Sequence, residues 1–123
     1  MTSPGDIEKK SFEIIAGLLG DKGPAGPERD VVVRVVHATA DLEFAGTMVF
    51  SDGAVRAGVE AIRSGSIVIT DVRMLQAGIS AAKLGGPGKV VCHISDPDVA
   101  DRAREDGTTR AAAAMKKAFA LVA

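Results

Sequence analysis

An arginine and a histidine three residues apart, Arg34 and His37, are the residues whose types and spacing best suit chemistry. On a helix this spacing places both side chains on one face. A guanidinium there can bind a carboxylate, and a histidine, with a model-peptide pKa of about 6.5, transfers protons near neutral pH. The pair indicates a site that holds an acidic ligand and exchanges a proton with it. The alternative is a surface arginine beside a histidine that a backbone carbonyl satisfies.

Composition limits the class of protein. With 123 residues, 46% of them hydrophobic and 25% charged, the chain predicts a single globular domain over residues 1–123. A net charge of -1 and the absence of Trp and Tyr argue against a nucleic-acid partner. No apolar run approaches the roughly 20 residues of a membrane span, and no secretory signal opens the chain, so we expect a cytoplasmic protein without membrane contact. The single cysteine, Cys92, lies in an apolar run and is expected to be buried and inert.

Three helices are predicted in the first half of the chain. The first begins with the Ser-Pro-Gly-Asp pattern at residues 3–6 and ends at Gly20. The second begins at Pro27 and carries the arginine and the histidine. Its five closely spaced valines favour a strand by propensity, but its Pro-Glu opening and its length favour a helix, which we predict. The third is expected between Ser51 and Gly65.

Two strands are predicted in the second half. Residues 66–70 and 89–94 are apolar, β-branched runs without alternation, which is typical of strands covered on both faces of a parallel sheet. A short helix is expected around residues 72–77, a further helix from Asp96 to Gly107, and an alanine-rich helix capped by Thr108. These elements predict an α/β fold with three α/β/α layers and a parallel sheet.

Two strands are too few for a stable parallel sheet. Three explanations stay open: the valine-rich segment forms a third strand, another subunit completes the layer, or the chain is the front portion of a larger domain. In open parallel sheets, ligands bind beyond the carboxyl ends of the strands. Asp71 and the turn at Ser95 and Asp96 therefore lie at the edge where a site is expected.

Four ordered motifs resemble the precorrin-8X methylmutase family over nearly the whole chain. They are Lys-Lys-Ser-Phe-Glu-Ile-Ile at 9–15, Arg-Val-Val-His at 34–37, Ile-Thr-Asp-Val-Arg-Met at 69–74 followed by Ala-Gly, and Thr-Arg-Ala-Ala-Ala at 109–113. The resemblance implies an α/β fold with a parallel sheet between helices, and a homodimer with its site near the subunit interface. It also implies an isomerase of cobalamin biosynthesis, which moves a methyl group from C-11 to C-12 of precorrin-8X, or its cobalt form, to give hydrogenobyrinate or cobyrinate.

The resemblance assigns roles to particular residues. His37 matches the family's proton-transferring histidine, which would protonate the conjugated macrocycle and lower the barrier to the shift. Ser11 and Arg34 fall where the family binds substrate, the first through its hydroxyl and the second through a peripheral carboxylate. Thr109 and Arg110 match a Thr-Arg pair expected near the substrate, although Arg110 by itself could balance neighbouring acidic residues.

Asp71 and His93 are two further polar residues near the predicted strands. Asp71 either orients the site, as a substrate-binding residue, or caps the next turn. His93 is on a predicted buried strand and is interpreted as structural. A methyl shift within one molecule needs no metal or redox cofactor, and the sequence has no metal-ligand cluster or nucleotide-binding glycine pattern, so no cofactor is expected.

The chain ends where members of the family continue into a further strand and glycine-rich segments. We therefore expect the family's C-terminal part to be absent, which leaves the activity of this short form open. Two non-enzymatic alternatives follow: a corrinoid- or tetrapyrrole-binding protein without turnover, and a dimerisation module in which the histidine has no role.

Overall fold

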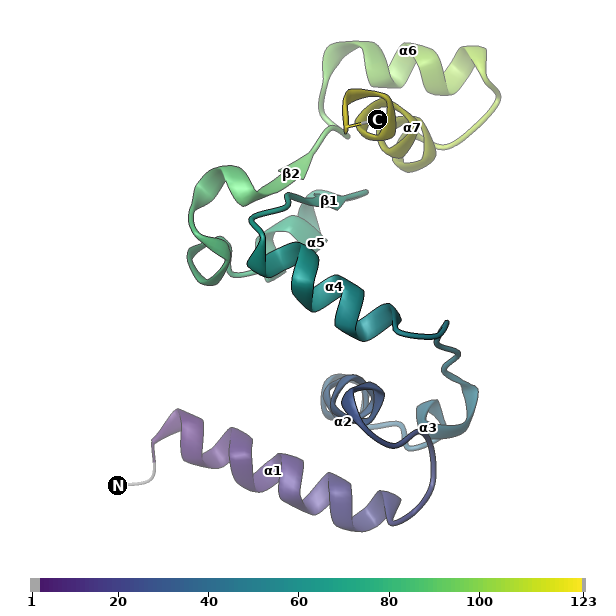
Figure 1. The fold of residues 1–123 in the computed structure, drawn as a ribbon. Coiled ribbons are helices and arrows are strands. Elements are labelled where there is room, and N and C mark those ends of the chain that lie inside the picture. Colours follow the sequence, from purple (N-terminus) through teal and green to yellow (C-terminus); the bar gives the residue numbers. More distant parts are fainter. Residues whose placement is uncertain (1–2, 123) are drawn as a thin grey trace. The chain divides into compact units, whose positions relative to one another are not determined.

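The computed structural model describes residues 3–122, and the packing of the chain divides it into two compact units, Met1–Gly58 and Val59–Ala123. We call them the N-terminal and the C-terminal unit and describe each by itself. Along the chain (Figure 1) the elements are α1 (Pro4–Leu19), α2 (Pro27–Thr39), α3 (Phe44–Thr47), α4 (Ala54–Arg63), β1 (Val68–Thr70), α5 (Arg73–Gly78), the 3-10 helices η1 (Ala81–Leu84) and η2 (Pro87–Lys89), β2 (Val90–Cys92), α6 (Pro97–Glu105) and α7 (Arg110–Val122).

Helix α1 begins and ends as its sequence predicts. The Ser3 hydroxyl accepts a hydrogen bond from the Asp6 amide at 3.2 Å, and the Asp6 carboxylate accepts one from the Ser3 amide at 3.0 Å. This reciprocal pair is a capping box. The Asp6 carboxylate also accepts from the Ser3 hydroxyl at 2.8 Å, and this bond, followed by the one from the Ser3 amide, holds the pKa of Asp6 below its usual value. At the other end, Gly20 adopts a φ of 52°, which a residue without Cβ accepts readily.

The valine-rich segment is the helix α2, as predicted, and not a strand. Its buried face consists of Val32, Val33 and Val36, which form a core with Ile15 and Leu19 of α1. Burial of this stripe outweighs the β propensity of valine because tertiary packing supplies most of a helix's stability. The explanation in which this segment provides a third strand is therefore excluded.

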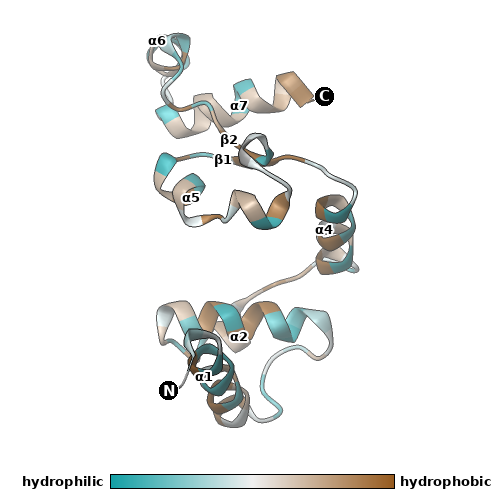
Figure 2. Ribbon diagram, turned by 90° about the vertical axis from the view of Figure 1, so that its left-hand side faces the viewer, coloured by the Kyte–Doolittle hydropathy of each residue, from teal (hydrophilic) through white to brown (hydrophobic). Residues whose placement is uncertain are grey.

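In the N-terminal unit, α1 and α2 cross at a wide angle, as Figures 1 and 2 both show. The hydropathy colouring of Figure 2 shows apolar and hydrophilic residues mixed along α1. Only some of the apolar side chains of α1 are buried. Ile15 and Leu19 face the core, whereas Ile7, Ile14 and Leu18 are each more than half exposed, at 62%, 56% and 62%.

In the C-terminal unit, β1 and β2 form a parallel pair in which Val68 lies opposite Val90 and Thr70 opposite Cys92. Helices α5 and α7 lie on opposite sides of the strands in Figures 1 and 2. The predicted α/β class with parallel strands is confirmed. Both strands are shorter than the runs that predicted them, since each run continues into residues without ladder bonds. Cys92 is buried, as expected.

Helices α6 and α7 pack through small residues. Val99 is fully buried in one cluster with Ala103, Ala113 and Ala114, which are each at most 5% exposed. Side chains this small let two helix backbones approach closely. The prediction that Thr108 caps α7 was wrong by one residue: the hydroxyl of Thr109 accepts the bond from the Ala112 amide, at 3.1 Å.

Across residues 3–122, no helix has both the length and the apolar character that a membrane crossing requires. A single family domain over residues 1–123 stays a prediction.

Candidate functional site on the first two helices

The packing of α1 on α2 brings Ser11 to His37. The Ser11 hydroxyl oxygen lies 3.0 Å from Nδ1 of His37, which is the distance of a hydrogen bond. Ser11 is half-buried beside the core, and His37 is exposed near the end of α2. Because Nδ1 is engaged, the other ring nitrogen, Nε2, is the one left to face a ligand.

Phe12, the next residue of α1, contacts both members of the arginine-histidine pair. The guanidinium carbon of Arg34 lies 4.9 Å from the centre of the Phe12 ring. The His37 ring centre lies 5.1 Å from it, with the two rings nearly perpendicular at 77°. These are the geometries of a cation over an aromatic face and of an edge-to-face pair.

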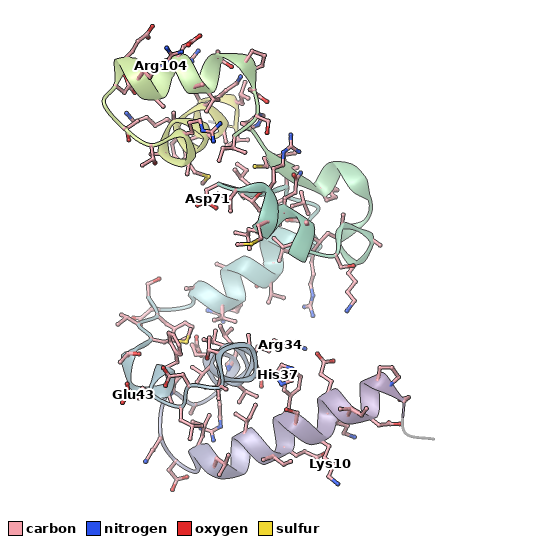
Figure 3. All side chains as sticks on the ribbon, turned by 180° about the vertical axis from the view of Figure 1, so that it is seen from behind. Lys10, Arg34, His37, Glu43, Asp71 and Arg104 are labelled. Carbon is pink, nitrogen blue, oxygen red and sulfur yellow. The ribbon has the colours of Figure 1, made fainter. Side chains whose placement is uncertain are left out.

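Glu8 provides a carboxylate beside Arg34. One guanidinium nitrogen lies 3.8 Å from the carboxylate, and both side chains are more than half exposed, at 67% and 52%. A pair this long and this exposed contributes little to stability. Arg34 is therefore available to a competing carboxylate. Figure 3 shows Arg34 and His37 together on α2, above α1.

Two shallow cavities flank these residues along α1. One, of 450 Å³, includes Phe12, Arg34 and Lys9 in its wall. The other, of 310 Å³, has Ser11 at its edge and is mostly apolar, with Ile7, Ile14 and Ile15 in its lining. A larger cavity of 730 Å³ near α3 holds none of the predicted site residues. The site therefore has a mostly apolar cavity on one side, and on the other a cavity lined by both charged and apolar side chains.

The structure thus brings together Ser11, Arg34 and His37, three of the six residues selected from the sequence. It also adds Phe12 and Glu8, which sequence reasoning missed. Phe12 stands next to Ser11 in the motif at 9–15, but nothing in that motif reveals a contact with a side chain of the second helix.

The other three selected residues belong to the C-terminal unit. Asp71 follows β1 and is half-buried, at the carboxyl end of the strand. Helix α5 has Val72 as its N-cap and no side-chain capping bond, so the interpretation of Asp71 as that cap was wrong. Thr109 is the cap of α7, and Arg110 is exposed in the first turn.

The prediction that His93 lies within a buried strand was wrong, because His93 lies one residue beyond the end of β2. Its Nδ1 lies 2.9 Å from Oδ2 of Asp96, and its side chain is 24% exposed. The same carboxylate oxygen lies 2.7 Å from Nζ of Lys117, which also reaches Asp98 at 2.5 Å. This network joins the end of β2, the start of α6 and the middle of α7, which supports the structural interpretation of His93.

The network shifts the titration of its members. Hydrogen bonds from Lys117 and then from His93 hold the pKa of Asp96 below 3.8, and the bond from Lys117 does the same for the pKa of Asp98. In turn, the hydrogen bonds to Asp96 and Asp98 raise the pKa of Lys117 above 10.5. Each shift arises because a partner favours the charged form.

Within residues 3–122, no three His, Cys, Asp or Glu side chains are grouped so that they could hold a metal ion. The expectation that no cofactor is needed stays a prediction.

The fold and the site together define an α/β protein that presents a serine-bound histidine and an arginine on two packed helices. The family model for precorrin-8X methylmutase matches residues 6–122. The chain belongs to the precorrin-8X methylmutase family.

Individual relatives give the same result. The chain is 42% identical to the cobalt-precorrin-8 methylmutase of Priestia megaterium, over 94% of this chain and 52% of that protein. It is 38% identical to the enzyme of the same name from Methanocaldococcus jannaschii, over 95% of this chain and 56% of that protein. A solved precorrin-8x methyl mutase from Thermus thermophilus matches with a TM-score of 0.76 and 39% identity, over 92% of this chain and 54% of the other. The chain spans about half the length of the curated relatives it matches.

Proposed function

We propose that this chain carries the proton-transfer centre of an isomerase that moves a methyl group from C-11 to C-12 of precorrin-8X or cobalt-precorrin-8. The product would be hydrogenobyrinate or cobyrinate, in cobalamin biosynthesis. The observation that carries the proposal is the 3.0 Å contact between Ser11 and Nδ1 of His37, beside Arg34. Family membership and the names of the relatives support the reaction.

His37 would act as the acid and then as the base. When the imidazole is protonated, Nδ1–H donates to the Ser11 hydroxyl oxygen and Nε2–H points to the ligand. Transfer of the Nε2 proton gives the macrocycle a positive charge, and the methyl group then leaves C-11 as its bond to C-12 forms. Return of the proton to Nε2 restores the enzyme, so no atom is gained or lost. While Nε2 is without its proton, the neutral imidazole keeps its proton on Nδ1, which still donates to the Ser11 hydroxyl oxygen, so the ring orientation is the same throughout.

Arg34 would bind a carboxylate at the edge of the macrocycle. A precorrin carries several peripheral carboxylates, and arginine binds such groups by paired, charge-assisted hydrogen bonds. The apolar walls along α1 suit the hydrocarbon part of the ring. Because Arg34 is exposed, binding should weaken as salt is added.

Residues of the C-terminal unit, a second subunit and further segments would complete the surroundings of the site. Asp71, Thr109 and Arg110 would contact the substrate or orient groups that do. The working protein would be a cytoplasmic homodimer with its site near the subunit interface. Since this chain spans about half of its relatives, further walls of the site would come from segments that those relatives possess.

The test is an absorbance titration of the chain with precorrin-8X. The isomerase proposal predicts a spectral change to product, and a loss of about 10²- to 10⁴-fold in rate for His37→Asn with ligand binding largely kept. His93→Asn removes the other histidine and is the matched control, which should keep the rate. A rate that His37→Asn leaves unchanged would contradict the proposal.

A second candidate, a corrinoid-binding protein without turnover, is favoured by one observation: Arg34 is 67% exposed, whereas catalysis of this kind benefits from exclusion of water. Salt-sensitive binding of hydrogenobyrinate without conversion of precorrin-8X would support this alternative.

A further inference from the structure

The ring of Phe12 contacts the two functional side chains of α2. Arg34 contacts it at 4.9 Å and His37 at 5.1 Å, each measured to the ring centre. We propose that Phe12 is a positioning residue, whose ring holds the guanidinium and the imidazole in separate, fixed orientations. The proposed reaction assigns Phe12 no part in proton transfer, so this role goes beyond it.

Phe12 is suited to this role because it is anchored. Its side chain is partly buried and packs against the core that Ile15, Val33 and their neighbours form between the helices. A phenylalanine has only two side-chain torsions, and packing against the core restricts both. The ring is therefore a fixed surface at the edge of a rigid helix pair.

Arg34 and His37 are not packed into the core in this way. Arg34 is a long side chain that is 67% exposed, and His37 is exposed near the end of its helix. An exposed side chain samples several rotamers, and each one that misdirects the reactive atom reduces the productive population. Contact with one anchored ring restricts the rotamers of both the Arg34 and the His37 side chain.

The chemistry of the ring explains why an aromatic residue is needed. The face of a benzene ring carries partial negative charge and attracts a guanidinium, whereas its edge is positive and favours perpendicular ring pairs. Leucine fills a similar volume but has neither property. Arg34 and His37 are neighbours on one face of α2, and both are positive when His37 is protonated, so separate contacts with the ring keep them apart.

The effect on catalysis rests on the proposed function, but the positioning does not. It can therefore be measured by spectroscopy without turnover. The chain has two histidines, so ¹⁵N NMR of the imidazoles is simple to assign with the His93→Asn variant. The ¹⁵N shift of Nδ1 reports its hydrogen bond with the Ser11 hydroxyl, which can accept from Nδ1–H or donate to a bare Nδ1 and which forms only while the ring is held in place.

We expect Phe12→Leu to move the ¹⁵N shift of the His37 Nδ1 towards the value that it takes in Ser11→Ala, where the hydrogen bond is absent, and Phe12→Tyr, which keeps the ring, to restore it. Phe44→Leu is the matched control, since Phe44 is also partly buried against the same core. In turnover, Phe12→Leu should lower kcat about ten- to a hundredfold and raise KM less, because orientation of the reacting groups is lost.

An unchanged ¹⁵N shift of the His37 Nδ1 in Phe12→Leu would overturn the positioning role, as would an equal change in Phe44→Leu. If the spectra change as expected but no form of the chain converts precorrin-8X, the isomerase proposal fails and the positioning role stands. If the wild-type chain converts precorrin-8X and Phe12→Leu keeps its kcat, the catalytic importance of the contact is refuted.

Discussion

The Ser11 hydroxyl lies 3.0 Å from Nδ1 of His37, although the two residues are 26 positions apart in the chain. The contact exists because both helices bury apolar stripes in one core, so that their polar neighbours meet at its rim. A single hydrogen bond thereby selects the nitrogen with which the histidine can act. The same bond provides the most direct test of the site.

Under the proposed isomerase function, Ser11→Ala should lower the turnover of precorrin-8X about three- to tenfold, since one hydrogen bond contributes about 0.5 to 1.5 kcal/mol. The loss should appear mainly in kcat, because the bond orients the acid and contributes less to holding the substrate. Ser11→Thr keeps a hydroxyl and should retain more activity. Steady-state kinetics of the three forms provide the comparison, and a wild-type kcat in Ser11→Ala would show that the hydrogen bond has no catalytic role.

Glu8→Gln should strengthen the binding of a polycarboxylate ligand by up to about fivefold at low salt. The Glu8 carboxylate competes for Arg34 in the free protein, and an exposed pair of this kind contributes at most about 1 kcal/mol. Titration with hydrogenobyrinate at two salt concentrations measures the change, which should shrink at high salt. Glu43→Gln makes the same change of charge on another exposed glutamate, so an equal gain there would point to net charge and not to Arg34.

The network of Lys117 with Asp96 and Asp98 should make the stability of the C-terminal unit depend on acid pH. Both carboxyl groups have pKa values lowered from 3.8, so the folded state binds protons less readily than the unfolded chain. The resulting stabilisation is present above about pH 4 and is lost as the pH falls through the lowered values. On the alkaline side, the raised pKa of Lys117 keeps its contribution until the pH rises through that value, above 10.5.

Lys117→Met should therefore lower the midpoint of thermal unfolding near neutral pH, and the difference from wild type should shrink below about pH 4. Lys116→Met is the control, because Lys116 makes a single, more exposed pair with Asp106. Thermal unfolding followed by circular dichroism at several pH values measures both variants. A difference that stays constant down to about pH 2 would show that loss of packing, and not of charge pairing, causes the effect.

Much of this architecture could be predicted from local sequence. The cap of α1 at Ser3, its end at Gly20 and the helical nature of the valine-rich segment were all correctly predicted, since each depends on neighbouring residues. The β-strands were placed correctly but predicted too long, because an apolar run says nothing about how many residues find ladder partners.

The site was predictable only in part, for a related reason. His37 and Arg34 could be paired because residues three apart share a helical face. The contacts of Phe12 and Glu8 with those side chains depend on how α1 crosses α2, which the sequence of neither helix states by itself. The role of Asp71 as a cap was wrong because the helix that follows starts one residue later than a cap at that position would allow.

Outside the apolar core, Arg29 provides the side-chain contacts on which the packing of α1 against α2 should depend most. From the first turn of α2, its guanidinium donates to the carbonyl oxygens of Gly20 at 2.5 Å, Lys22 at 3.2 Å and Ala16 at 3.4 Å. The Ala16 carbonyl, in the last turn of α1, also accepts the Gly20 amide at 3.1 Å, whereas the carbonyls of Gly20 and Lys22 lie beyond the last residue of the helix. One side chain thus closes α1 and ties it to α2.

Arg29→Met should reduce the free energy of unfolding by about 1 to 3 kcal/mol, because it keeps the aliphatic length but leaves these acceptors without their donor. Arg29→Lys, which offers one charge without the planar fork, should recover only part of the loss. Urea unfolding measures the free energies, and the NMR signals of His37 in the folded state show whether the contact with Ser11 loosens as well. If Arg29→Met unfolds like the wild type, the carbonyls exchange the guanidinium for water at no cost, and packing of Val32 and its neighbours alone holds the two helices together.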